Sequence, residues 1–198
     1  MVHHVVYIPG LGDSRPRGQT VILYFWKLFG LNVHYFPLGW ADKEAFEPKL
    51  GRLLKLIDEL ELQEGAVSLV GVSAGASAVL NAYAKRGGIN SVICICGKIN
   101  SPQAISERTY RINPAFKQSM FGVKQSLDKL TPAQNSRIMS IHPLSDGTVP
   151  LSDTAIPGAV EKTAPVVGHI FGIFYSITFG AAGIAKFLKS QAAKAKQS

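Results

Sequence analysis

The sequence contains little cysteine, and this shortage excludes a fold held together by disulfides. Only two cysteines, Cys94 and Cys96, occur among 198 residues, whereas small crosslinked scaffolds need several pairs. The two alternate within an apolar run, so we expect both on one face of a strand, where residues two apart are poorly placed to bond. Free thiols are typical of a reducing compartment, which predicts a cytoplasmic protein.

Acidic residues are also in short supply. The chain has 13 Asp and Glu against 21 Lys and Arg, for a net charge of +8. Such a surface attracts nucleic acid, anionic lipid or an anionic substrate, but the chain has no zinc-type Cys/His spacing, RNP-like segment or base-reading basic helix. We therefore expect no nucleic-acid partner, and we interpret residues 191–198 as a solvated basic tail.

Apolar runs long enough to cross a membrane are nearly absent. Residues 1–5 lack the basic and apolar regions of a signal peptide. Residues 166–187 are nearly all apolar and about as long as a membrane span, but they contain four glycines. We expect a buried last helix from about Phe171 to Lys189, with a membrane anchor as the alternative.

The chain does have enough apolar material for a full core. Hydrophobic residues make up 46% and charged residues 17%, which excludes disorder and suits one domain, residues 1–190. Short apolar runs alternate with helical stretches, which predicts an α/β fold: a three-layer α/β/α sandwich with a mostly parallel sheet of about six strands. The expected strands are 2–8, 32–36, 66–70, 91–96, 137–141 and 159–163.

The alternation breaks in residues 98–135. This segment contains three prolines, several charges and two helical pieces, near 103–110 and 114–127. We interpret it as an insertion over the sheet rather than a separate domain.

The segment Gly71-Val72-Ser73-Ala74-Gly75 carries the strongest chemical signal. It fits G-x-S-x-G between an expected strand and an expected helix, the context in which a serine stands exposed on a sharp turn. Glycines on either side avoid collisions with that turn. The alternative is a plain turn serine or a phosphate-binding turn, but the P-loop lysine and the dinucleotide glycine spacing are missing.

A serine nucleophile needs a base and an orienting acid, expected in the order serine, acid, histidine. Asp146 and His169 each follow an expected strand in that order. Asp146 is alternatively a turn residue, since Asp-Gly is a common turn pair, and Asp153 is its competitor, with a helix cap as its expected role. Four other histidines come too early in the chain: His3, His4, His34 and His142.

These motifs together resemble the α/β-hydrolase superfamily over nearly the whole chain. The loop Tyr7-Ile8-Pro9-Gly10-Leu11-Gly12 matches the family's oxyanion loop, so the resemblance implies backbone donors at Leu11 and Ala74. Asp13 and Arg15 follow that loop and are expected to form a salt bridge or to contact a polar substrate. The chain is similar to compact serine hydrolases, because it begins at the equivalent of the family's third strand.

The same resemblance puts residues 98–135 where the family has its cap over the active site. An amphipathic cap would suit an apolar acyl chain and exclude water. The alternative is a pair of helices that only covers the sheet edge.

The sequence therefore predicts a carboxylesterase-like serine hydrolase that cleaves a small-molecule ester or thioester through Ser73, Asp146 and His169, without metal or cofactor. A serine peptidase with the same residues is an alternative. So is a non-catalytic or weakly catalytic binding or regulatory protein on the same fold. A further alternative is a membrane-associated hydrolase, docked by the last helix and the lysine-rich end.

Overall fold

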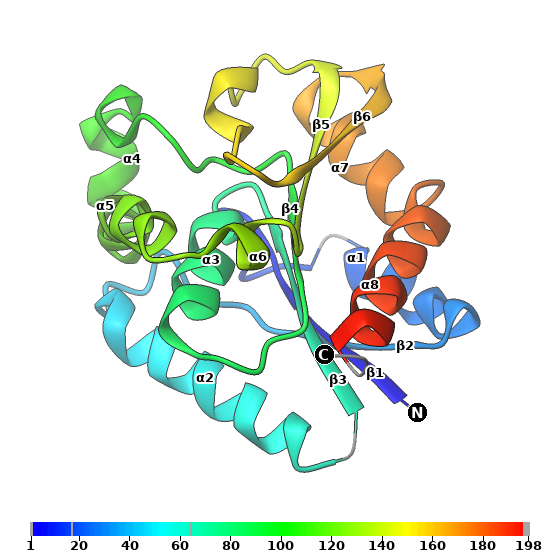
Figure 1. The fold of residues 1–198 in the computed structure, drawn as a ribbon. Coiled ribbons are helices and arrows are strands. Elements are labelled where there is room, and N and C mark those ends of the chain that lie inside the picture. The colour runs from blue at the N-terminus through cyan, green and yellow to red at the C-terminus, as the bar shows by residue number, and fades with distance from the viewer. Residues whose placement is uncertain (1, 17, 64, 196–198) are drawn as a thin grey trace.

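The computed structural model describes residues 2–16, 18–63 and 65–195, and these form three layers around one sheet (Figure 1). The sheet has six strands in the order β2-β1-β3-β4-β5-β6, and every neighbouring pair is parallel. The prediction of a three-layer α/β/α sandwich is confirmed. The strands are β1 (Val2–Ile8), β2 (Leu31–Tyr35), β3 (Gly65–Val72), β4 (Val92–Ile95), β5 (Ile138–Ser145) and β6 (Val160–Val167).

Parallel pairing brings the carboxyl ends of all six strands to one edge of the sheet. The chain runs from β1 outward to β2 and then returns to β3 on the other side of β1. Ligands of open α/β sheets bind outside the carboxyl ends at such a reversal. The register Ile8↔Gly71 aligns the end of β1 with the turn that carries Ser73.

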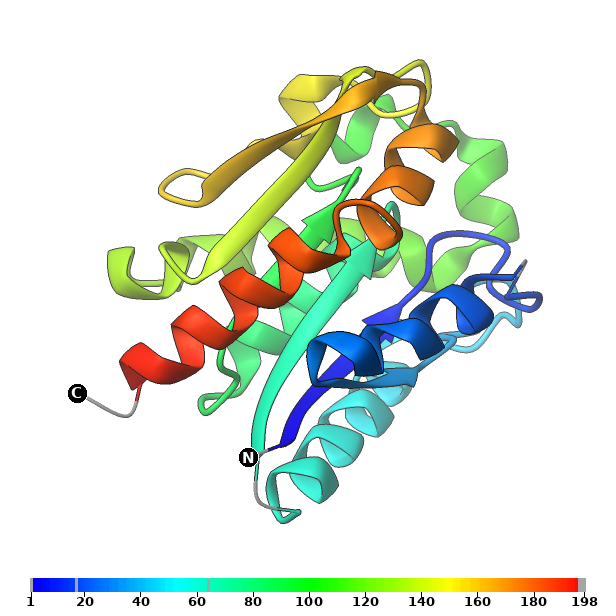
Figure 2. The same ribbon diagram turned by 90° about the vertical axis from the view of Figure 1, so that its right-hand side faces the viewer.

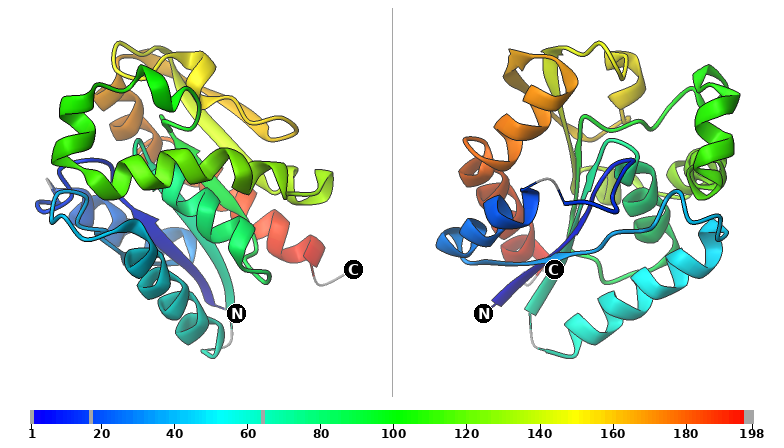
Figure 3. Two further views of the ribbon diagram at one scale, coloured as in Figure 1. Left: turned by 90° about the vertical axis from the view of Figure 1, so that its left-hand side faces the viewer. Right: turned by 180° about the vertical axis from the view of Figure 1, so that it is seen from behind.

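Helices cover both faces of the sheet. One side, here called the α3 layer, is at the front of the left view in Figure 3. The other side, the α8 layer, faces the viewer in Figure 2. The α3 layer consists of α2 (Phe46–Glu61), α3 (Gly75–Lys85), α4 (Glu107–Ile112), α5 (Pro114–Asp128) and the short α6 (Pro132–Asn135). The α8 layer consists of α1 (Gln19–Tyr24), the 3-10 helix η1 (Phe25–Phe29), α7 (His169–Ile177) and α8 (Ala181–Ala195). Two further 3-10 turns are η2 (Pro102–Ala104) and η3 (Leu151–Thr154).

Each layer has its own hydrophobic core against the sheet. Side chains alternate along β1, so Val6 and Ile8 face the α3 layer while Val5 and Tyr7 face the α8 layer. The apolar face of α2 follows the helical period and is buried at Leu53 and other positions, as its sequence predicts.

Residues 98–135 form part of the α3 layer. Phe116 and Met120 of α5 are buried in its core, and Ser119 lies 2.7 Å from Ser77 of α3, oxygen to oxygen. The segment is thus packed along α3 by both apolar and polar contacts.

The expected single last helix is wrong, because the chain forms two. Helices α7 and α8 meet at an angle of 63° across the break at residues 178–180. The expected basic tail is also shorter, since α8 continues to Ala195 and buries Gln191; residues 196–198 lie outside the described part. No single helix in that part is long and apolar enough to span a membrane, and only the bent pair reaches the required length and composition.

The expectation that both cysteines share one face is wrong as well. Cys94 belongs to the α3-layer core and Cys96 to the α8-layer core. Strand β4 ends at Ile95, and Cys96 has a left-handed backbone with φ of +49°. This reversal of the chain turns the second side chain to the opposite face, and both thiols are free and buried.

Candidate active site

Ser73 lies on a sharp turn between β3 and α3. Its φ of +52° is unusual for a residue with a side chain and costs conformational energy. The backbone on both sides of this residue is anchored: the Ser73 amide donates to the Ile95 carbonyl at 2.9 Å, and the Ser73 carbonyl accepts from the Lys98 amide at 3.1 Å. The strained turn is therefore held by the neighbouring strand and the loop that follows it.

The glycines around Ser73 are required by close backbone approach. A Cβ on Gly71 would lie 2.5 Å from the Gly75 carbonyl oxygen, and a Cβ on Gly75 would collide with the Ile8 carbonyl. The two glycines of the predicted elbow thus let β1, β3 and α3 converge at the serine.

Ser73, His169 and Asp146 form a continuous chain of hydrogen bonds. The His169 Nε2 atom lies 3.0 Å from the Ser73 hydroxyl, and its Nδ1 atom lies 2.7 Å from Asp146 Oδ2. The tautomer that satisfies both contacts carries the proton on Nδ1, so that Nε2 accepts from the serine. Ser73 and His169 are 96 positions apart along the chain and His169 and Asp146 are 23 apart, yet the three residues meet at one edge of the sheet.

Asp146 is held by its own turn. Its second carboxylate oxygen accepts hydrogen bonds from the Thr148 and Val149 amides at 2.8 and 2.9 Å, and its side chain is fully buried. Asp146 is therefore both the first residue of the Asp-Gly turn and the hydrogen-bond partner of His169. The amide of Gly168 donates to the Ser145 carbonyl at 2.7 Å, which ties the histidine loop to the acid loop.

The competing residues lie elsewhere. Asp153 is buried and pairs with Lys98, so its expected role as a helix cap is wrong. His3 bonds to Ser68, and His142 bonds to the carbonyl of its neighbour Pro143. His4 and His34 bond to each other at 3.0 Å.

The loop after β1 lies directly against Ser73. A Cβ on Gly10 would lie 2.9 Å from the Ser73 Cβ. Among the hydrogen bonds of the described residues, none uses the Leu11 or Ala74 amide as donor, so both are available to a ligand. Asp13 accepts from the Gly39 amide at 2.6 Å and forms no ion pair with Arg15, which corrects the expected salt bridge.

Two buried side chains that sequence reasoning missed support this loop. The Trp40 indole N–H donates to the Pro9 carbonyl at 3.2 Å. The fully buried ammonium of Lys49 donates to the carbonyls of Leu38 and Gly39. No local motif predicts these contacts, because Trp40 is 31 residues from Pro9 and Lys49 is 11 and 10 residues from Leu38 and Gly39.

A cavity of about 220 Å³ opens beside Ser73. Its walls come from the loop after β1, from the ends of β2 and β3, from Thr148 and from helices α1 and α7 of the α8 layer; no residue of 98–135 contributes, although the structure describes that whole segment. The helices of this segment pack within the α3 layer, and a cap over the active site stays a prediction. The lining includes Leu11, Arg15, Tyr35, Thr148, Ile170 and Ile173.

One cluster near the site has metal-ligating residue types. The candidate ligand atoms of Cys96, Asp146 and His169 all lie within 4.8 Å of one another. Burial, aided by the Asp146 charge, raises the pKa of the Cys96 thiol to about 12, which disfavours the thiolate that a metal requires. Both His169 nitrogens already have partners, so this arrangement favours a hydrogen-bonded chain over a metal site.

Solved structures of low sequence identity are similar to this chain. Est1E from Butyrivibrio proteoclasticus gives a TM-score of 0.72 at 14% identity, with 97% of this chain and 89% of that chain covered. A monoacylglycerol lipase from Paleococcus ferrophilus gives 0.60 at 14% identity, with 95% and 94% covered. An alpha/beta hydrolase superfamily protein from Enterococcus faecalis gives 0.57 at 17% identity, with 96% and 91% covered. No protein-family model and no curated protein sequence matches the chain. The protein has an α/β-hydrolase fold.

Proposed function

We propose that this α/β-hydrolase-fold protein is a serine hydrolase that cleaves a small carboxylic ester or thioester. The observation that carries the proposal is the hydrogen-bonded chain from Ser73 through His169 to Asp146, with the serine on a strained turn. Such a chain has little structural value at the edge of a sheet, whereas acyl transfer requires its order of groups. The esterase and lipase among the fold neighbours are consistent with it.

In the first half of the reaction, Ser73 Oγ attacks the carbonyl carbon while His169 Nε2 takes the hydroxyl proton. Asp146 keeps Nδ1–H oriented and stabilises the imidazolium that forms. The carbonyl oxygen becomes an oxyanion, which the free amides of Leu11 and Ala74 receive. His169 then protonates the leaving alcohol or thiol, and the acyl group stays on Ser73.

In the second half, a water molecule attacks the acyl-enzyme. His169 takes a proton from this water and returns it to Ser73 Oγ, so the products are a carboxylic acid and the regenerated serine. The balance is one ester and one water consumed for one acid and one alcohol or thiol released.

The cavity beside Ser73 supports a small substrate. Its volume of about 220 Å³ is below the range of roughly 300–1,000 Å³ typical of drug-sized ligands. Leu11, Ile170 and Ile173 line it with apolar surface, which suits a short acyl group. The two free cysteines support a cytoplasmic location as part of the same proposal.

The test is turnover of p-nitrophenyl esters from acetate to palmitate by the wild-type protein and the Ser73→Ala variant. We expect a maximum at a short acyl chain and loss of turnover in the variant. A fluorophosphonate probe is expected to label the wild-type protein at Ser73 only.

Turnover that survives in Ser73→Ala would refute the mechanism. Absence of both labelling and turnover would favour a binding protein on this fold, whereas labelling with cleavage of peptides but not esters would favour a peptidase.

A further inference from the structure

The net positive charge is confined to part of the chain. Residues 14–35 and 162–198 hold eight basic and no acidic residues, whereas the remaining chain holds 13 of each. These two segments build α1, η1, β2, α7, α8 and most of β6. Six of these eight residues lie in the described part of the chain. Four of the six, Lys27, Lys186, Lys189 and Lys194, belong to the α8 layer, whereas the residues outside the two segments carry no net charge.

The same side exposes large apolar side chains. Leu28 of η1 is 81% exposed, Phe171 of α7 is 67% exposed, and Phe179 in the break before α8 is 76% exposed. The Trp26 indole of η1 donates to the Ile177 carbonyl at the end of α7, so η1 and α7 are joined on the same side of the sheet, the side that faces the viewer in Figure 2. We name this surface the basic apolar face: Val21, Tyr24, Phe25, Leu28, Phe29, Ile170, Phe171, Phe174 and Phe179, with the lysines Lys27, Lys186, Lys189 and Lys194.

Two lysines of this face reach η1, which carries several of its exposed apolar side chains. The Lys27 ammonium lies 4.5 Å from the centre of the Tyr24 ring. The Lys189 ammonium reaches Gly30 at the end of η1, 3.0 Å from where a Cβ would stand. Within the described residues, no lysine of the face forms an ion pair (the ion pairs of the chain are almost all on the α3 side).

The mixture of exposed aromatic, aliphatic and lysine side chains limits what can cover the face. A second copy of the chain would bring like charges together, which disfavours a dimer. Nucleic acid would use the lysines but leave the isolated apolar side chains without a role. A bilayer with anionic headgroups satisfies both groups at once: apolar side chains enter the acyl boundary while lysines contact the headgroups.

We propose that the basic apolar face docks on the surface of an anionic lipid bilayer. The protein lies on such a surface rather than spanning it, because apolar and charged side chains share one side of a folded domain. Ile170 belongs to this face and also lines the Ser73 cavity. Docking therefore brings the mouth of the cavity to the lipid surface. The docking itself does not depend on the proposed hydrolase activity.

The first test is flotation of the full-length protein with vesicles. One set contains phosphatidylcholine alone, and the other contains about one-third phosphatidylserine. We expect binding to the anionic vesicles, weak binding to the neutral ones, and a steep loss of binding as salt is raised, because salt screens the lysines.

A charge-reversal pair tests the lysines. In Lys186→Glu/Lys189→Glu the affinity for anionic vesicles is expected to fall by about 25-fold or more, since each lysine near such a surface contributes about fivefold. The matched control Lys124→Glu/Lys129→Glu changes the net charge equally on exposed positions of the α3 layer, and it is expected to bind nearly as well as the wild type.

A second pair of variants tests the apolar side chains. Leu28→Ser/Phe171→Ser is expected to weaken binding at least tenfold while the melting temperature stays close to that of the wild type, because both side chains are exposed. The control Leu62→Ser/Phe121→Ser removes exposed side chains of the α3 side and is expected to leave binding unchanged.

Three outcomes overturn the docking proposal. One is absence of binding to anionic vesicles, including the case in which the protein instead binds a soluble polyanion such as heparin. Another is an equal loss of binding in the test and control pairs. The third is a concentration-dependent dimer that Leu28→Ser/Phe171→Ser abolishes. Ester turnover is measured in parallel, so that loss of docking with turnover intact separates this proposal from the proposed function.

Discussion

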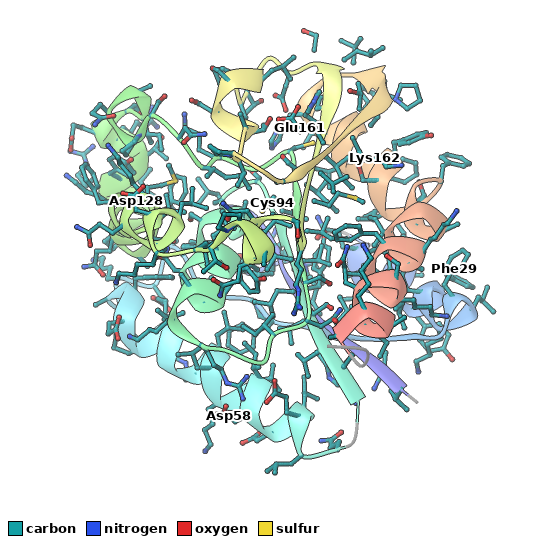
Figure 4. The ribbon with its side chains drawn as sticks, in the orientation of Figure 1. Phe29, Asp58, Cys94, Asp128, Glu161 and Lys162 are labelled. Carbon is teal, nitrogen blue, oxygen red and sulfur yellow. The ribbon has the colours of Figure 1, made fainter. Side chains whose placement is uncertain are left out.

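The two helical layers cover opposite faces of one sheet, yet they differ in charge and in the side chains they expose. The α3 layer pairs its charges: Arg86 bonds to Asp58 and Glu61, and Lys49 bonds to Asp42. The α8 layer has lysines without acidic partners and exposed aromatic rings. Figure 4 labels Asp58 and Asp128 on the α3 side and Phe29 at the outer surface of the α8 side.

This difference shows that the burial of a layer's inner face against the sheet does not determine the charge or the exposed side chains of its outer face. Both layers bury a continuous core, so both satisfy the fold equally well. The candidate site lies where they meet, because Ser73 leads into α3 and His169 begins α7. The proposed hydrolysis thus depends on both layers, whereas the proposed docking depends on one.

The largest effect is expected from a substitution at the candidate site, to which both layers contribute. Replacing His169 by Ala removes the base that α7 supplies to the serine at the start of α3, and turnover is expected to fall by about 10⁴- to 10⁶-fold. The control His142→Gln changes a histidine that bonds only to its neighbour's carbonyl, and its turnover is expected to stay within about twofold. Steady-state ester hydrolysis measures both. A His169→Ala enzyme of nearly normal rate would show that the layers need not meet for catalysis.

The next effect tests what fastens the α8 layer. Trp26 is 1% exposed and donates to the end of α7, so Trp26→Ala is expected to lower the free energy of unfolding by about 3–5 kcal/mol. In Trp26→Phe most of the volume remains and the hydrogen bond is lost, which is expected to cost about 1–2 kcal/mol. Urea denaturation followed by circular dichroism measures both. Equal losses in the two variants would contradict a role for the buried volume.

A pH effect of intermediate size comes from His3. Burial, together with the charge of Lys189 on α8, lowers its pKa to about 4. Between pH 6.5 and 4 the unfolded chain therefore binds more protons than the folded chain. The free energy of unfolding is highest above pH 6.5, and it is expected to fall by about 3 kcal/mol as the pH is lowered to 4.

Urea midpoints from pH 7.5 to 4 measure this loss, and His3→Gln is expected to flatten the profile. Lys189→Gln is expected to raise the pKa of His3 in an NMR titration. Such a rise would show that the positive charge of Lys189 in the α8 layer acts on His3 in strand β1. The same slope in wild type and His3→Gln would assign the acid sensitivity to other groups.

The smallest effect is expected when a charged side chain with acidic partners is neutralised in one layer and one without such partners in the other. Arg86→Gln removes a surface pair of contacts to Asp58 and Glu61 and is expected to cost about 0.5–1 kcal/mol at low salt, less at high salt. Lys186→Gln on the α8 layer has no partner to lose, so its stability is expected to match or slightly exceed that of the wild type. Thermal melting at two salt concentrations distinguishes the two. A loss of stability in Lys186→Gln as large as that in Arg86→Gln would contradict the difference in charge pairing between the two layers.

Much of the fold was predictable because its signals are local. Apolar runs of strand length marked all six strands, and the period of α2 marked its buried face. The turn at Ser73 was predictable from its G-x-S-x-G pattern. The steric demand on Gly71 comes from Gly75, within the pattern, whereas the demand on Gly75 comes from Ile8 of the distant strand β1. Asp146 and His169 could be chosen from their order along the chain, and the structure brings both to Ser73.

The errors share a different cause. The face of Cys96 depended on one backbone reversal after β4, and the break between α7 and α8 depended on how each helix packs. The sequence left open whether residues 98–135 act as a cap or cover the sheet, because an amphipathic helix does not specify its partner. Their place along α3 followed from contacts such as Ser119 with Ser77.

The parallel α/β architecture, the serine turn and the order of Ser73, Asp146 and His169 could all be inferred from the amino-acid sequence. These features depend on backbone sterics and side-chain periods within short windows. The three-dimensional structure was needed to show which helices cover which face, how Trp40 supports the loop beside Ser73, and that four lysines and the exposed rings share one side. Those outcomes depend on contacts between distant segments, and such contacts are set by the burial of the whole chain rather than by any one segment.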